Sequence, residues 1–297
     1  MRGLLLPLLL ALAGCATPPG SRDLTVLCHT VDPPVQWGAV SGLSMDRHHL
    51  YAVHDHNRPN PEILVLRLTS GEASIVRRLP LLDQAGYLDL EGISRREGSG
   101  FWAVSEGRGR QENRLLRIDA DGVVAEQVRL PHSVRIHRRK GGFEGVAARG
   151  RDPNEEVVVA FQHPWKDDPP GTVKLGRYWP MEKRWELFRY PLDDPRSGLS
   201  ALAFLPDGRL AVLERDNKPL FRAKIKRIYV VELPHDALPG KPLEKRLLLD
   251  LLQWRGHLLQ CGTNGKFEGL AAAGPRHLFL VADDDGDASA RILELTW

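Results

Sequence analysis

The sequence lacks most of the motifs that would point directly to an enzyme class. It has only three cysteines, no Cys-x-x-Cys pair and no Gly-x-Ser-x-Gly nucleophile elbow. Residues 262–266 are too short for a phosphate-binding loop. Serine-triad and nucleotide-dependent chemistry are therefore unsupported. The formal net charge of +3 comes without a long basic tract, so no nucleic acid partner is expected.

Long apolar runs and helical periodicity are also missing from most of the chain. After the N-terminus no apolar run is long enough to span a membrane, so we expect the remainder to be soluble. No stretch keeps a helical period over three turns. A chain of 297 residues is ample for one large core, and we expect a single all-β domain that is a monomer.

The N-terminus predicts export. Residues 1–2 supply a positive start, and residues 4–13 form an apolar run about half as long as a membrane span, as in a signal peptide. The run ends in the letters LAGC (residues 12–15), which resemble the lipobox of bacterial lipoproteins. This resemblance implies cleavage before Cys15 and acylation of that residue. Because Ala16 follows, it also implies sorting to the outer membrane, facing the periplasm.

These features divide the chain into three parts. Residues 1–14 are the expected signal peptide, residues 15–22 the lipidated cysteine with its tether, and residues 23–297 the folded domain. An ordinary secretory signal with an incidental cysteine is the alternative.

Five segments of the mature sequence resemble one another. Each has Ser or Glu, then Gly, an apolar residue and Ser or Ala, followed by a short strand-like stretch. The shared glycines are Gly42, Gly92, Gly145, Gly198 and Gly269. Their spacings of 50, 53, 53 and 71 residues match the period of a β-propeller blade.

Further β-branched or aromatic stretches complete each unit, separated by turn dipeptides such as Asp121-Gly122. The fifth unit ends at Trp297 without a fourth strand, whereas residues 24–30 precede the first unit without a partner. We predict that residues 24–30 form the outer strand of the last blade, because such closure removes exposed sheet edges. The count is five blades, with six as the alternative because the last interval is longer.

This closure bears on the two cysteines that remain after Cys15. Cys28 would lie in the closing strand, in the same blade as the loop that carries Cys261. A disulfide that holds the ring shut and a pair of free thiols both remain open.

The repeat brings oxygen-bearing side chains to two matching positions. The residues before the shared glycine are Ser41, Glu91, Glu144, Ser197 and Glu268. The residues that end the second strands are Asp55, Glu106, Gln162, Glu214 and Asp283. Approximate rotational symmetry would turn each set into a ring.

So many carboxylates cannot all ionise in a narrow space, so some stay protonated or a cation is bound. Oxygen donors without thiolate favour Ca²⁺, and less strongly Mg²⁺, over a soft transition metal. The predicted metal ligands are Glu91, Glu144, Glu268, Asp55 and Asp283. A structural role for the Glu-Gly pairs is the alternative, with Glu bonding nearby backbone N–H groups. Zinc binding by the histidines near these strand ends is a further, weaker alternative.

Basic residues lie close to these acids along the chain. Arg215, Lys266 and Arg108 are each within two residues of one of them. Arginine beside a cation site is expected for phosphate or carboxylate ligands, because guanidinium binds such groups bidentately. A solvated loop is the alternative, above all for the basic run at residues 135–140.

The segments that carry these residues resemble the bacterial esterase-like phytase, or phytase-like, family. The similar stretches are residues 90–93, 142–145, 213–216 and 266–270, and the likeness spans roughly residues 36–296. The resemblance implies an exported propeller, and the family's name suggests phosphoester or ester hydrolysis. In the related alkaline propeller phytases, calcium held by acidic residues binds phosphate and activates water.

By that likeness, acidic residues would hold metal or orient water, and Arg215 and Lys266 would bind phosphate. The acids with an expected catalytic role are Glu144, Glu268 and Glu214. Two serines stand where other repeats have Glu, so the number of metal ions stays open. Two hypotheses follow: a calcium-dependent hydrolase of ester bonds, phosphoesters before carboxylesters, and a non-catalytic propeller that binds a ligand or an envelope protein.

Overall fold

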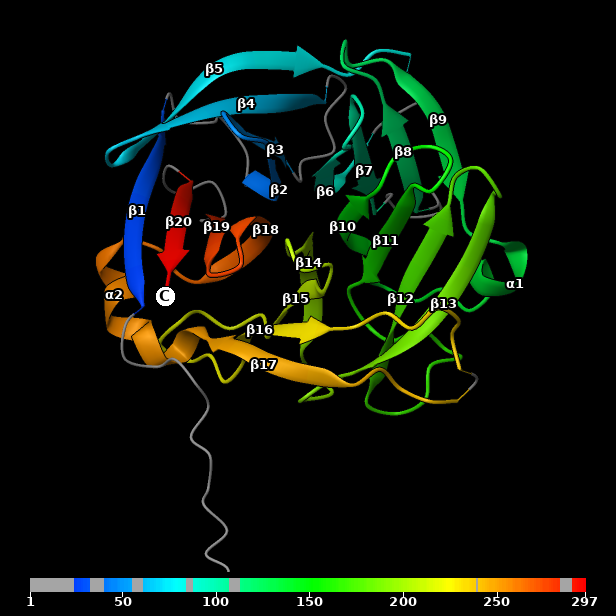
Figure 1. Cartoon of the computed structure of the whole chain (residues 1–297). Helices are drawn as coiled ribbons and strands as arrows, with labels where there is room; N and C mark the ends of the chain where they lie inside the picture. Colours follow the sequence, from blue (N-terminus) through cyan, green and yellow to red (C-terminus); the bar gives the residue numbers. More distant parts are fainter. Residues whose placement is uncertain are drawn as a thin grey trace, which may run out of the picture.

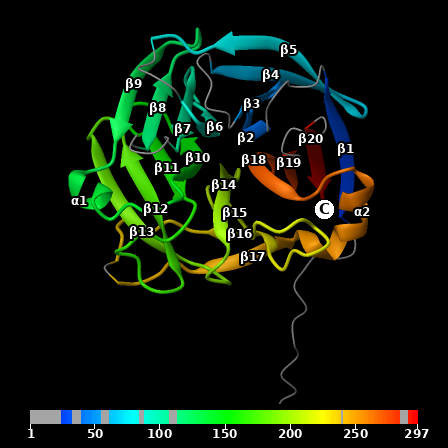
Figure 2. The same cartoon turned by 180° about the vertical axis from the view of Figure 1, so that it is seen from behind.

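The structure is a computed structural model that describes residues 24–32, 40–54, 61–83, 88–106, 113–238, 240–283 and 290–297. Its strands stand around a central axis (Figure 1), and the same ring is visible from behind (Figure 2). The described strands form five antiparallel units of four strands, which we call blades 1 to 5. The predicted all-β propeller is confirmed.

Within blades 1 to 4 the strands follow chain order from the inner strand to the outer strand. Blade 1 contains β2 (Val40–Met45), β3 (Leu50–His54), β4 (Glu62–Thr69) and β5 (Glu72–Pro80). Blade 2 contains β6 (Leu90–Arg95), β7 (Phe101–Ser105), β8 (Arg114–Ile118) and β9 (Val124–Arg129). Blade 3 contains β10 (Phe143–Arg149), β11 (Glu156–Phe161), β12 (Thr172–Trp179) and β13 (Arg184–Pro191). Blade 4 contains β14 (Gly198–Phe204), β15 (Leu210–Arg215), β16 (Lys226–Val231) and β17 (Lys245–Asp250).

Blade 5 joins the two ends of the chain, as predicted. It contains β18 (Lys266–Gly274), β19 (His277–Asp283), β20 (Arg291–Thr296) and, as its outer strand, β1 (Thr25–Asp32). The antiparallel register of β1 and β20 runs from Thr25↔Thr296 to Thr30↔Arg291. The end of β1 also pairs in parallel with the start of β5 in blade 1, from Thr30↔Glu72 to Asp32↔Ser74, so the closing strand bridges two blades and covers part of each outer edge.

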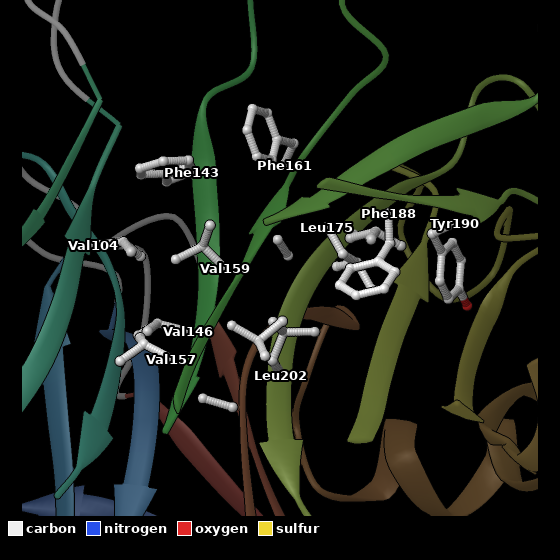
Figure 3. Close-up of a cluster of buried hydrophobic side chains, with 14 of the residues drawn as sticks. Val104, Phe143, Val146, Val157, Val159, Phe161, Leu175, Phe188, Tyr190 and Leu202 are labelled. Carbon is white, nitrogen blue, oxygen red and sulfur yellow. The ribbon is translucent and has the colours of Figure 1, made fainter. Parts of the chain in front are cut away.

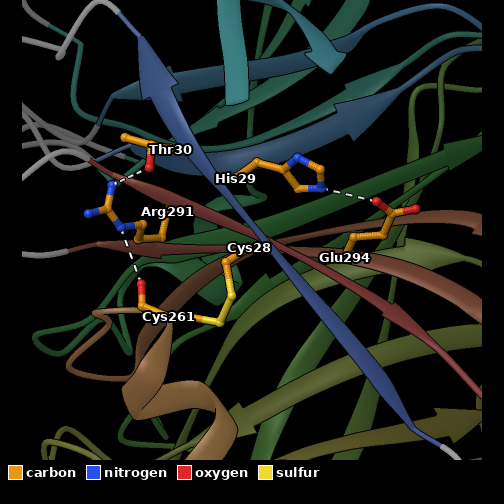
Figure 4. The surroundings of a disulfide bond; sticks show 6 residues. All are labelled: Cys28, His29, Thr30, Cys261, Arg291 and Glu294. Atoms are coloured by element: carbon orange, nitrogen blue, oxygen red, sulfur yellow. Dashed lines mark hydrogen bonds and ion pairs between the residues drawn. A yellow bond between two sulfur atoms is a disulfide. The ribbon is translucent and has the colours of Figure 1, made fainter. Parts of the chain in front are cut away.

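Side-chain contacts reinforce this closure (Figure 4). Cys28 and Cys261 form a disulfide with a Cα–Cα distance of 5.6 Å across 233 residues of sequence. Arg291 donates from Nε to the Cys261 carbonyl at 3.2 Å and from Nη1 to Thr30 Oγ1 at 2.8 Å. A cross-link that closes so long a segment restricts the unfolded chain strongly, and a native disulfide typically contributes about 2–4 kcal/mol.

The helices are short and lie in connections. They are α1 (His132–Arg135) before blade 3, and η1 (Leu251–Trp254) and α2 (Arg255–Gln260) between β17 and β18. The long fourth repeat interval contains η1 and α2. No helix among the described residues is both long enough and apolar enough to cross a membrane.

The strands form because apolar residues dominate them and their ends carry turn residues. Gly122, in the predicted turn, and Gly208 have φ of 91° and 85°, a left-handed conformation that favours glycine. The largest buried cluster spans blades 2, 3 and 4 and contains Phe143, Phe161 and Leu202 (Figure 3). Burying one such side chain contributes about 1.5–3 kcal/mol, so the packing between blades fixes the inner strands that bear the site.

Candidate functional site at the channel mouth

Each inner strand carries a β-bulge near the Glu-Gly or Ser-Gly pair of the repeat. The register shifts occur between Val40 and Leu43, Leu90 and Gly92, Phe143 and Val146, Leu199 and Ala201, and Phe267 and Gly269. A bulge adds a residue to one strand and re-aims its side chain. The polar residues within the bulges are Ser41, Glu91, Glu144, Ser200 and Glu268. Four of the five residues predicted for this ring therefore lie in bulges, and in blade 4 the bulge holds Ser200 in place of Ser197.

Blade 4 departs from the predicted alignment. Ser200 and Ala201 occupy the positions that the sequence comparison assigned to Ser197 and Gly198. Gly198 instead pairs with Arg215, ahead of the bulge. In blade 4 the Ser-Gly pair lies three residues before the bulge. The burial of alternate residues sets the register of a strand, so a two-residue motif can match at a position that is not structurally equivalent.

The other shared glycines allow adjacent inner strands to touch. A Cβ on Gly42 would lie 2.5 Å from the Gly92 Cα atom, and a Cβ on Gly269 would lie 2.5 Å from the Ser41 carbonyl oxygen. The space between the inner strands at this level is only about 10 Å³. This space is the central channel of the propeller, and we call its end beside the last residues of the second strands the mouth. A ligand larger than a water molecule or an ion would therefore bind at the mouth.

The ends of the second strands require a related correction. Leu199 pairs with Glu214 just before the bulge, as Leu90 pairs with Ser105. The residue in blade 4 that matches Glu106 is therefore Arg215, and Glu214 lies one place earlier. Consecutive residues of a strand point to opposite faces, so this shift of one residue removes Glu214 from the ring of acids.

Glu214 is fully buried and makes four contacts elsewhere. Its Oε1 accepts hydrogen bonds from the Ser197 hydroxyl and the Asp193 N–H, both at 2.7 Å. Its Oε2 accepts from Lys245 Nζ at 2.7 Å and from the Tyr190 hydroxyl at 3.3 Å. A carboxylate with all its lone-pair directions engaged is suited to holding blades together, so the predicted catalytic role for Glu214 does not fit its position.

Arg215 forms a buried ion pair with Glu268. Its Nη2 contacts both carboxylate oxygens of Glu268, and its Nε donates to the Phe267 carbonyl at 2.8 Å. Only 5% of Arg215 and 6% of Glu268 are exposed. Burial alone would lower the pKa of Arg215, but Glu268, and beyond it Glu144 and Glu91, hold that pKa above its usual value.

Lys266 lies 3.7 Å from Glu268 through its Nζ atom and is one-third exposed. Glu268 thus has two cations beside it. The phosphate-binding role predicted for Arg215 would require its buried pair to open, whereas Lys266 is accessible.

Three carboxylates gather on the blade 2 side of the mouth. One ligand oxygen from each of Asp89, Glu91 and Glu106 lies within 4.8 Å of the others. Ser41 donates from its hydroxyl to Glu91 Oε2 at 3.2 Å, and Gly142 N–H donates to Glu106 Oε1 at 3.1 Å. Like charges this close favour a bound cation or a shared proton. Of the predicted metal ligands whose side chains the structure describes, Glu91 belongs to this group and Glu144 and Glu268 do not.

A buried amide lies beside Glu106. Asn113 is 3% exposed, and neither its Nδ2 nor its Oδ1 atom has a hydrogen-bond partner among the residues that the structure describes. A Cβ placed on Gly142 would lie 2.2 Å from Asn113 Oδ1 and 2.6 Å from Glu106 Cγ, so the amide oxygen and Glu106 face the same point. A buried amide without a partner costs about 1–3 kcal/mol, so a water molecule or a cation in contact with this amide would stabilise it.

The donor set suits a hard divalent cation, because every available ligand atom is a carboxylate or amide oxygen. Sequence reasoning noted Glu106 as an aligned acid but missed Asp89 and Asn113. Asp89 could have been found, since it precedes Glu91 by two residues and strand residues two apart share a face. Asn113 gave no signal of its own.

Part of the basic run at residues 135–140 reaches the mouth. Arg138 donates from Nη2 to the Glu106 carbonyl at 3.3 Å. Burial lowers the pKa of His163 despite a hydrogen bond with the Ser197 backbone, and the charges of Arg215 and Lys140 lower it further. Arg139 and Lys140 are exposed.

Several predicted residues cannot be placed. Cys15, Asp55 and Arg108 lie outside the described residues, as does the side chain of Asp283 at the end of β19.

Several solved structures superpose on this chain at low sequence identity. A thermostable family-43 glycoside hydrolase superposes with a TM-score of 0.52 at 9% identity, covering 90% of this chain and 91% of that one. A luciferin-regenerating enzyme gives 0.48 at 11% identity, with 92% and 96% covered. Regucalcin, a calcium-binding protein from Agrobacterium tumefaciens, gives 0.44 at 16% identity, with 88% and 79% covered.

A comparison with curated proteins found no match. A family model described as phytase-like, esterase-like activity of phytase, matches residues 35–286, which is most of the chain. The propeller, its polar mouth and this match agree with the resemblance found in the sequence, and the chain belongs to the phytase-like family.

Proposed function

We propose that this protein is a calcium-dependent hydrolase of phosphate esters, and less favourably of carboxylate esters, which acts at the mouth of the propeller. The observation that carries the proposal is the group of three carboxylates within 4.8 Å beside an unpartnered buried amide. Membership in a family described by esterase-like activity supports the same reaction class.

The residues that would hold the cation are Asp89, Glu91 and Glu106, with the Asn113 amide oxygen beside them. A hard divalent cation supplies Lewis acidity toward a phosphoryl or carbonyl oxygen. Calcium is favoured over magnesium because the site offers several protein oxygens, whereas magnesium usually keeps most of its water.

The chain's own residues account for the rest of the reaction. Glu144 follows Glu91 in the polar ring and is nearly buried, which makes it our candidate for the base that accepts a proton from water. Arg138 and Lys266 place positive charge on two sides of the mouth. Such charge favours an anionic substrate, and a phosphomonoester more than a neutral carboxylester.

A non-catalytic binding propeller is the second candidate. One observation favours it: the space between the inner strands is very small, whereas a cleft of about 530 Å³ lies on the outer side of blade 4, away from the acids of the mouth. Phe188, Val230 and Leu238 line that cleft together with Lys241 and Arg246.

Hydrolysis by the full chain in detergent separates the two candidates. We expect p-nitrophenyl phosphate to be cleaved faster than p-nitrophenyl acetate with calcium, and chelation of calcium to stop the reaction. Glu144→Gln should reduce turnover at least about 100-fold. Glu126→Gln is the matched control, because Glu126 pairs with Arg117 at 3.1 Å on the outer part of blade 2. No turnover of either ester with calcium would leave only the binding function.

We further propose that Cys15 carries the lipid that anchors the protein to the outer membrane on its periplasmic side. Cells that express the protein should incorporate labelled palmitate into it, and Cys15→Ser should abolish the label. Label retained by Cys15→Ser would contradict the anchor.

A further inference from the structure

The mouth of the channel has a fixed positive charge at a place where other blades carry acids or an amide. The strand register puts Arg215 at the position that Glu106 has in blade 2 and Gln162 in blade 3. The same register places Lys226 opposite Arg215. Continuing the β7–β8 register by one pair places Asn113 opposite Glu106. Blade 4 therefore has two cations where blade 2 has an acid and an amide.

The guanidinium of Arg215 is held rigidly. Nη2 contacts both oxygens of Glu268, Nε donates to the Phe267 carbonyl at 2.8 Å, and Nη1 donates to Asn217 Oδ1. A planar group with bidentate and backbone contacts keeps one orientation, so its charge is permanent and fixed in place.

This charge has the same effect on Glu268 as a bound metal ion would have. Glu268 sits in a bulge equivalent to that of Glu91, yet its two oxygens face Arg215. Because both oxygens of Glu268 face the positive charge of Arg215, a metal ion bound to the same carboxylate would be repelled by that charge. Arg215 also acts electrostatically on Glu144 and Glu91, and so opposes a second cation nearby.

We infer that Arg215 is a built-in counter-cation that limits the mouth to one divalent ion, at Asp89, Glu91 and Glu106, and keeps Glu268 out of its coordination. The inference rests on the cation site of the proposed function. In this role Arg215 does not bind phosphate, which differs from the role predicted by the family resemblance. The polar residues at the mouth would then hold one divalent ion.

Calorimetric titration of the full chain with calcium chloride alone tests this inference. The wild-type chain should bind one calcium ion. Arg215→Met should bind two, because Glu268 loses the guanidinium that both of its oxygens face and keeps beside it only Lys266, which is one-third exposed, whereas Arg215→Lys, which keeps the charge, should bind one. Two ions bound by the wild type, or one by Arg215→Met with unchanged affinity, would overturn the inference.

A double variant guards against misfolding of Arg215→Met, which leaves Glu268 buried and unpaired. Arg215→Met with Glu268→Gln removes both charges of the pair, a replacement that is often neutral for stability, and it should bind one ion. A loss of calcium affinity above about 10-fold in the double variant would show that Glu268 is a ligand and overturn the inference.

The outcomes also separate this inference from the proposed function. One calcium ion in the wild type and two in Arg215→Met, without hydrolysis of any ester, would uphold the counter-cation and reject the hydrolase. No calcium binding by the wild type at millimolar concentration would reject the cation site and both proposals.

Discussion

The blade 2 side and the blade 4 side of the mouth share one backbone plan and carry opposite charge. In blade 2, Glu106 and Asn113 stand on facing strand ends; in blade 4, Arg215 and Lys226 hold the equivalent places. On one side three carboxylates lie within 4.8 Å. On the other, arginine neutralises Glu268. A propeller repeat therefore fixes the positions of side chains, while the residue types at those positions set the charge on each side of the mouth.

Glu268→Gln should produce the largest effect on the blade 4 side. It leaves the buried Arg215 charge without its partner, and breaking a buried pair typically costs about 3–5 kcal/mol. We expect that loss in the free energy of unfolding, measured by denaturant titration. Glu244→Gln is the control, because Glu244 is exposed and lies 3.6 Å from Lys241, and such pairs contribute at most about 1 kcal/mol. Equal losses in both variants would contradict the asymmetry.

Glu106→Gln should have the largest effect on the blade 2 side. The amide oxygen can still accept the hydrogen bond from Gly142 N–H at 3.1 Å, so the fold should be unchanged. We expect calcium affinity to fall about 100-fold, or about 2.7 kcal/mol, because one of three close charges is lost. Titration calorimetry with Glu126→Gln as control measures this. Unchanged affinity would exclude Glu106 as a ligand.

The stability of the protein should depend on pH because of Lys226, which lies on the blade 4 side. Burial, with the adjacent charge of Arg215, lowers the pKa of Lys226 to about 8 in the folded chain, against about 10.4 when unfolded. Between these values the unfolded chain binds more protons, so stability rises with pH, by about 2 kcal/mol up to about pH 10.

Denaturant titration at about pH 8 and at about pH 10 measures this rise as the difference between the two free energies of unfolding. The Lys226→Met variant should show no such difference. Tyrosines with a raised pKa, such as Tyr178 at about 12, act in the opposite direction only above about pH 10. The same slope in wild type and variant would contradict the role of Lys226.

Asn113→Ala should have the smallest effect. It removes an unpartnered buried amide, so stability without calcium should change by less than about 1 kcal/mol. Calcium affinity should fall about 10-fold, or about 1.4 kcal/mol, because an oxygen donor is lost. A variant that loses stability without calcium but keeps its affinity would show that the amide serves only the fold.

The sequence was sufficient for the ring and its closure. Glycine is needed where neighbouring inner strands touch, so Gly42, Gly92 and Gly269 marked equivalent places in the repeat. The closure was predictable because the fifth unit lacked a fourth strand and the strand-like residues 24–30 had no partner within the first unit. Blade 4 was misaligned because its Ser-Gly pair recurs ahead of the bulge, and a one-residue difference exchanges Glu214 for Arg215 at the mouth.

The cation site depends on features that short motifs do not reveal. Asn113 and Glu106 come together through strand register and a close approach to Gly142. The pairing of Glu268 with Arg215 joins two blades, and the side chains are 53 residues apart in sequence.

Anomalous scattering from crystals of the protein soaked with terbium, a stand-in for calcium at oxygen-rich sites, tests the central claim most directly. The account predicts a single peak in the anomalous difference map at the mouth, between the carboxylates of Asp89, Glu91 and Glu106 and next to the Asn113 amide. A peak beside Glu268, or none between the three carboxylates, would contradict it.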